Sequence, residues 1–170
     1  MAACLARFSV TSCSSSRDEV YVAAMALRAS KGPARFLFST AYSLNFWDLH
    51  HFMVIVNPTS TSNPIPTVYD FQPQDPENIW VAAAALSGRK VAGVILVRKL
   101  EKLPKRKCWF VGYAKGNDDE AAAQKFNRNW ETDLILGYHD CRHYTQGLVE
   151  HLTGKKAVLD HLRANQYTSI

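Results

Sequence analysis

Short runs of apolar residues, bounded by glycine, proline and small polar residues, recur through the first two thirds of the chain. Runs rich in β-branched and aromatic residues predict strands, which we expect at residues 20–27, 50–56, 67–71, 91–100 and 107–113. Because the first run also contains alanines, a helix is an alternative prediction there. Residues 57–66 (NPTSTSNPIP) are polar and turn-forming, so the second and third strands should pair across them as a hairpin.

Helical spacing of apolar positions alternates with these runs and dominates the C-terminal third. It predicts helices at residues 34–44, 76–86, 118–130, 140–152 and 156–163, and Asp75, Asn117 and Asp140 stand where N-caps are expected. We find no internal repeat and no linker that would divide the chain. The predicted fold class is α+β: a small, mostly antiparallel sheet packed with helices in a single domain over residues 18–170.

Composition narrows the class of protein. The chain has 170 residues, of which 47% are hydrophobic and 21% charged, as in ordinary globular domains. The longest apolar run, residues 91–97, has seven residues, far from the roughly 18 that span a bilayer. We therefore expect a soluble protein without a transmembrane segment.

The net charge of +5 is modest and concentrated in one place. Six bases face one acid between residues 98 and 107, which indicates a local patch and argues against a nucleic-acid-binding chain. We expect this stretch to form a basic hairpin between two strands, able to contact a protein partner or an anionic surface. Its bases are Arg98, Lys99, Lys102, Lys105, Arg106 and Lys107.

Residues 1–17 (MAACLARFSVTSCSSSR) carry arginine and serine but no acid. That composition is typical of an organellar transit peptide, with a plastid favoured over a mitochondrion, although a plain disordered leader has the same composition.

Cys141 is the strongest candidate for chemistry. The loop residues 137–140 (GYHD) place this thiol at the first position of a predicted helix, where free backbone N–H groups and the helix dipole favour a thiolate. A nucleophilic cysteine also needs a base and a group that orients the base. His50 or His51, of which alternation lets only one face the thiol, and Asp70 on the next strand could supply them. The alternative is a core cysteine, which is the commoner role of a thiol on an apolar helix.

A metal site is the competing interpretation of the same segment. His139, Cys141 and His143 lie within five residues, but on a helix the middle residue points away from the other two. We therefore expect no metal, and no glycine-rich phosphate loop indicates any other cofactor.

Three segments carry a family resemblance. Residues 51–56 (HFMVIV), 68–73 (VYDFQP) and 140–145 (DCRHYT) resemble, in order and approximate spacing, the "His-Trp-Ala-Ile-Tyr-Val", "Val-Val-His-Leu-x-Pro" and "Asn-Cys-Glu-His-Phe-Val" motifs of the lecithin:retinol acyltransferase-like family. These enzymes are circularly permuted relatives of NlpC-type papain-fold peptidases. The resemblance implies a papain-like fold in which Cys141 is the nucleophile, His51 the base and Asp70 the orienting residue.

Two functions follow as expectations. The first is a thiol-dependent hydrolase or acyltransferase that acts through Cys141, His51 and Asp70 on an amide, ester or thioester bond of an acyl or peptide-like substrate. The second is a non-catalytic assembly or scaffold module of the same fold that binds a macromolecular partner through its basic hairpin. Asp140, which replaces the family's asparagine, favours the second, because a carboxylate beside the thiol opposes a thiolate.

Overall fold

The computed structural model describes residues 17–26, 50–59, 64–116 and 118–167. Their fold is α+β, built on one six-stranded sheet with the order β5-β1-β2-β3-β4-β6 and antiparallel pairing throughout. The strands are β1 (Glu19–Ala26), β2 (His50–Asn57), β3 (Thr67–Pro73), β4 (Val91–Lys99), β5 (Cys108–Tyr113) and β6 (Asp133–Leu134). The described helices are α2 (Ile79–Leu86), α3 (Asp119–Asn129), α4 (Cys141–Thr153) and α5 (Val158–Tyr167).

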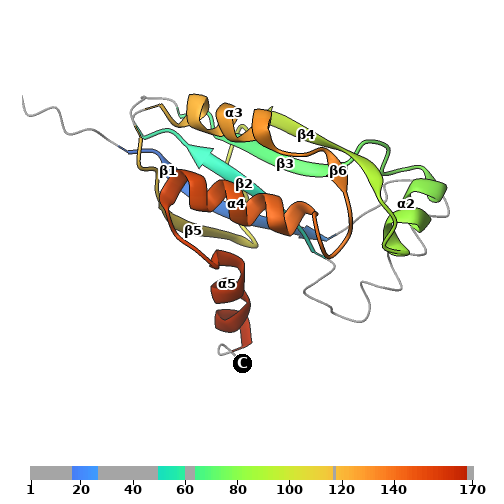
Figure 1. Ribbon diagram of the computed structural model, residues 1–170. Coiled ribbons are helices and arrows are strands. Elements are labelled where there is room, and N and C mark those ends of the chain that lie inside the picture. Colours follow the sequence, from blue (N-terminus) through green and yellow to red (C-terminus); the bar gives the residue numbers. More distant parts are fainter. Residues whose placement is uncertain (1–16, 27–49, 60–63, 117, 168–170) are drawn as a thin grey trace, which may run out of the picture.

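Helix α4 covers one face of the sheet, with α3 beside it and α5 at the β5 side (Figure 1). The main core lies beneath it, because the apolar stripe of α4 meets alternate residues of the strands. This core includes Tyr144, Leu148, Val149 and Leu152 from α4 and Val22, Phe52, Val54 and Phe71 from the sheet, all at most 2% exposed.

The other face of the sheet carries a smaller apolar cluster of Ala23, Met53, Ile55 and Val68. Residues 100–107, which we call the crossing segment, contribute Leu100 and Leu103 to the packing against it. Both ends of the segment are hydrogen-bonded next to inner strands: the Leu100 N–H donates to the carbonyl of Pro66, just before β3 (2.8 Å), and the Ala24 N–H of β1 donates to the Lys107 carbonyl (2.9 Å).

The predicted basic hairpin is therefore wrong. Strands β4 and β5 do not pair with each other, since β1, β2 and β3 lie between them. The physical reason is the pair of leucines among the bases: a solvated hairpin would leave them in water, whereas the crossing segment packs them on the sheet.

The predicted strands and the β2–β3 hairpin are confirmed, and the first run is a strand. Two of the predicted N-caps, those of α2 and α3, are not confirmed. Helix α2 begins after Asn78, whose side chain accepts from the Trp80 N–H (2.9 Å), because Asp75 belongs to the preceding turn. Helix α3 is capped by Asp118, which accepts from the Ala121 N–H (2.9 Å).

At the C-terminal end, α4 runs from the N-cap Asp140 to the left-handed C-cap Gly154, close to its predicted limits. Helix α5 begins two residues later than predicted, because Ala157 has a positive φ of 53° that a helix cannot contain. The helix expected at 34–44, residues 1–16 of the expected leader and the predicted cap Asn117 lie outside the described residues. None of the helices in the described part of the chain is long and apolar enough to cross a bilayer.

Candidate active site

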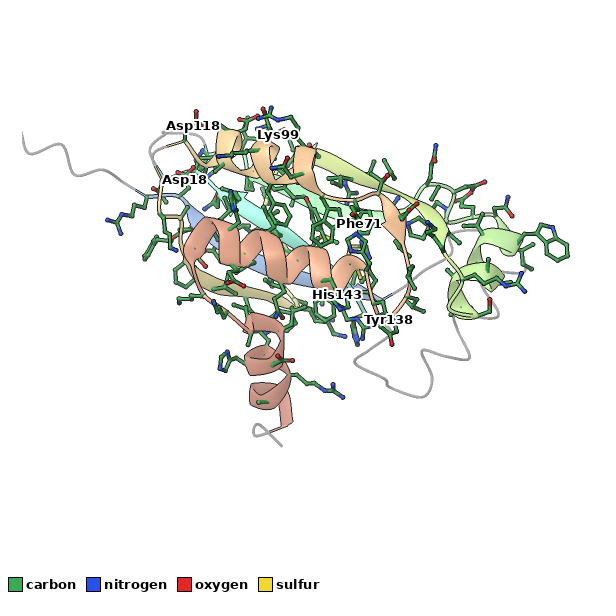
Figure 2. All side chains as sticks on the ribbon, in the orientation of Figure 1. Asp18, Phe71, Lys99, Asp118, Tyr138 and His143 are labelled. Atoms are coloured by element: carbon green, nitrogen blue, oxygen red, sulfur yellow. The ribbon has the colours of Figure 1, made fainter. Side chains whose placement is uncertain are left out.

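The sheet opens at the end where β2 begins. Strands β2 and β3 pair at three positions, from Val54–Tyr69 to Val56–Thr67, and the ladder between them stops there. Beyond that point β2 stays paired with β1 as far as His50, and β3 stays paired with β4 as far as Pro73. The two halves of the sheet thus form a fork, and the N-terminal end of α4 lies at the same end of the sheet (Figure 1). Tyr138 and His143 mark this end of α4 in Figure 2.

His51 and Asp70 face each other across the fork. The His51 Nε2 donates to Asp70 Oδ1 at 2.5 Å, and the two side chains are 13% and 2% exposed. By alternation both belong to the face that carries Ile55 and Val68, opposite α4, but they lie at the open end of the sheet, where β2 and β3 are no longer paired and the head of α4 is close. Because Nε2 is engaged by the carboxylate, the other ring nitrogen, Nδ1, is left for a further partner.

Cys141, at the head of α4, is hydrogen-bonded to His51 at this open end of the sheet. Burial acts to lower the pKa of His51, but hydrogen bonds with Asp70 and Cys141, and the charges of both groups, outweigh burial and raise the pKa to about 10. The thiol belongs to the first residue of α4, where backbone N–H groups are free of intrahelical acceptors. The structure thus brings together the three residues predicted from the sequence, and of the two adjacent histidines His51 faces the thiol.

Asp140 does not oppose this arrangement in the way the sequence suggested. It is 1% exposed, caps α4 by accepting from the Arg142 N–H (3.0 Å), and accepts from the Gly137 N–H (2.8 Å). Burial acts to raise the pKa of Asp140, but the Arg142 guanidinium (2.8 Å), the Gly137 N–H and His143 Nδ1 (2.9 Å) together hold it well below its usual range. The negative charge beside the thiol is therefore balanced by Arg142.

Sequence reasoning missed Arg98 as a site residue and placed it in a surface patch. Its Nη2 donates to Asp70 Oδ2 at 2.8 Å, so Asp70 has a second cationic partner besides His51. A signal was present, because Asp70 sits in an otherwise apolar strand and a buried carboxylate needs a cation or several donors. Arg98 is the first base of a neighbouring predicted strand.

The other candidate histidines, His139 and His50, have different contacts. The ring of His139 stacks on Trp130, with centroids 4.4 Å apart, and bonds the Glu131 carbonyl through Nε2 (2.9 Å). The His50 Nε2 accepts from Lys107 Nζ at 2.7 Å. Within the described ranges, no three His, Cys, Asp or Glu side chains gather as a metal site would require.

The six bases of the predicted patch are divided by the fold. Arg98 and Lys107 contact Asp70 and His50, and Lys99 donates to Thr67 Oγ1 (2.8 Å). Lys102, Lys105 and Arg106 are exposed on the crossing segment.

An open groove of about 510 Å³ lies beside the first turns of α4, between that helix and α5. Its lining is largely polar and carries both signs of charge, from Arg142, Glu150, Asp160 and Arg163.

Comparison of the chain with protein-family models, with curated proteins and with solved structures gives no match in any of the three. The interpretation of the site therefore rests on its own geometry.

Proposed function

We propose that the protein is a thiol-dependent hydrolase or acyltransferase that acts on an amide, ester or thioester bond. Cys141 is the nucleophile, His51 the base and Asp70 the group that orients the imidazole. The contact of His51 with both Cys141 and Asp70 supports this most directly. Such a chain of thiol, imidazole and carboxylate is the arrangement that nucleophilic cysteine catalysis requires.

The reaction has two halves. His51 takes the thiol proton, Cys141 Sγ attacks the acyl carbon, and the leaving group departs with the proton from the imidazolium, which leaves a thioester on Cys141. Water or another acceptor then attacks the thioester and gives its proton to His51. The acyl group leaves the enzyme and the proton returns to the thiolate.

The chain order also supports a finer proposal about the fold. His51 on a strand, Asp70 on the next strand and Cys141 at the head of a later helix follow the order of the lecithin:retinol acyltransferase-like motifs. We propose on this basis that the α+β fold is the permuted papain-like one. Balanced by Arg142, Asp140 is compatible with an active thiol.

Alkylation of Cys141 by iodoacetamide, followed peptide by peptide with mass spectrometry between pH 5 and 10, tests the proposal. Cys108 is the reference thiol within the same molecule, because burial raises its pKa. We expect Cys141 to react at lower pH than Cys108, and we expect His51→Ala to slow its reaction at neutral pH by tenfold or more. Equal profiles for the two cysteines, unchanged by His51→Ala, would rule the proposal out.

A second candidate function, a binding module without catalysis, has one observation in its favour. The crossing segment exposes Lys102, Lys105 and Arg106, while its partly buried leucines pack against the sheet. Under this alternative, replacing the three bases by glutamine abolishes co-purification of a protein or anionic partner, while Cys141→Ala has no effect. The opposite pattern favours the enzyme.

The organellar location also remains a proposal. Fusion of residues 1–17 to a fluorescent protein should direct it to plastids, and diffuse fluorescence would contradict a transit peptide.

A further inference from the structure

The carboxylate of Asp70 is shared between two cations from different strands. Oδ1 accepts from His51 Nε2 at 2.5 Å, and Oδ2 accepts from Arg98 Nη2 at 2.8 Å. Asp70 itself is 2% exposed, while the Arg98 side chain is 51% exposed. Each oxygen thus has its own partner, and Arg98 closes one side of the buried carboxylate toward solvent.

The strand register explains how Arg98 reaches this position. On β4, Arg98 lies opposite Val68 and Leu96 lies opposite Asp70. Arg98 is therefore on the same face as Asp70, in the diagonal position from which a long side chain can reach it. The contact is held by β3–β4 pairing that extends over seven residue pairs, so Arg98 anchors Asp70 to the half of the sheet that does not carry His51.

We propose that Arg98 is a positioning residue for the Cys141–His51 pair and acts on it through Asp70. This inference rests on the proposed function. The Arg98 guanidinium fixes the plane of the carboxylate, so that Oδ1 stays on His51 Nε2 and the imidazole keeps its contact with the thiol. Its positive charge also offsets the negative charge of Asp70, which would otherwise oppose formation of a thiolate on Cys141.

The sign of the effect follows from these charges. When Arg98 is replaced by a neutral residue, the charge of Asp70 is no longer balanced, so the thiolate forms at higher pH. The unbalanced carboxylate also raises the pKa of His51, so the imidazolium persists to higher pH. Both changes move in the same direction, and the half-exposed position of Arg98 limits them by solvent screening.

The experiment compares the pH profile of Cys141 alkylation by iodoacetamide in the wild-type chain and in Arg98→Gln, Arg98→Lys and Lys99→Gln. Lys99 is the matched control, since it is the adjacent residue of β4 and contacts Thr67 and Glu120 instead. We expect Arg98→Gln to move the midpoint upward by between about 0.3 and 1 pH unit. Arg98→Lys, which keeps the charge, should lie between Arg98→Gln and the wild type, and Lys99→Gln should match the wild type.

A merely structural role for Arg98 would lower thermal stability without moving the profile, and that result would overturn the inference. Arg98→Met keeps the aliphatic stem and removes the charge, so it replaces Arg98→Gln if the latter does not fold. As a second readout, NMR titration of the His51 ring should show a higher midpoint in the neutral variant. If instead the wild-type profile is insensitive to His51→Ala, the proposed function fails, whatever Arg98 does.

Discussion

At Asp140 a single carboxylate both caps α4 and holds Arg142. Replacing it with alanine removes an N-cap acceptor and leaves Arg142 without this partner, so we expect the free energy of unfolding at pH 7 to fall by about 1–3 kcal/mol. Asp140→Asn keeps an oxygen for the cap and should lose less. Urea unfolding of the three proteins measures both differences.

The charge of Asp140 also sets a pH dependence. Its pKa is lowered in the folded state, so the stability it contributes is fully present above the unfolded value near 3.9 and is lost as the pH falls below it. The advantage of the wild type over Asp140→Asn should therefore shrink below pH 4. An advantage that stays constant from pH 6 to pH 3 would contradict this assignment.

The sequence predicted the site residues that lie in recognisable local motifs. It missed the residues whose contacts with the site form only when distant strands or loops fold together. Cys141, His51 and Asp70 were predicted because each lies in a recognisable segment. Arg98 was not, because its contact depends on the β3–β4 register. The role of Arg142 was also missed, since the loop turns the Asp140 carboxylate back over the first turn of α4.

Among the elements, strands were predictable and their order was not. Local apolar runs mark β1 to β5, and the short polar loop between β2 and β3 marks their hairpin. The pairing of β5 with β1 depends on contacts between residues distant in the sequence. The crossing segment packs Leu100 and Leu103 against the sheet and so places β5 beside β1. The periodicity of apolar residues within one element does not indicate this pairing.

Strand β4 offers a test of how tightly the layer beneath α4 is packed. A Cβ added at Gly93 would lie 2.7 Å from the Phe71 ring and 2.8 Å from the Thr132 carbonyl oxygen. Phe71 cannot move aside easily, because it is fully buried against Trp130, His139 and Tyr144. We expect Gly93→Ala to lower the free energy of unfolding by about 1–3 kcal/mol.

Gly116→Ala is the matched control, because the nearest atom to its added Cβ is the Asp119 carboxylate oxygen at an ordinary 3.5 Å. Thermal melts of both variants measure the difference. A Gly93→Ala variant as stable as Gly116→Ala would mean that the Phe71 ring is free to shift and that this layer is loosely packed.

For the whole molecule, the candidate site also links parts of the structure. His51 belongs to the β5-β1-β2 half of the sheet, Asp70 to the β3-β4-β6 half, and Cys141 to the helix that covers both. The contacts among these three residues close the open end of the fork. We therefore expect the protonation state of the site to affect the free energy of unfolding of the entire domain.

The direction of that effect follows from His51, whose pKa is raised to about 10 in the folded protein from about 6.5 in the unfolded chain. The stability it contributes is fully present below pH 6.5 and is lost as the pH rises through 10. The loss of stability caused by His51→Ala should accordingly be largest near pH 6 and should decline steadily toward pH 10, as measured by urea unfolding. A loss of stability that stays the same from pH 6 to pH 10 would mean that the site does not hold the fork together through the charged imidazole.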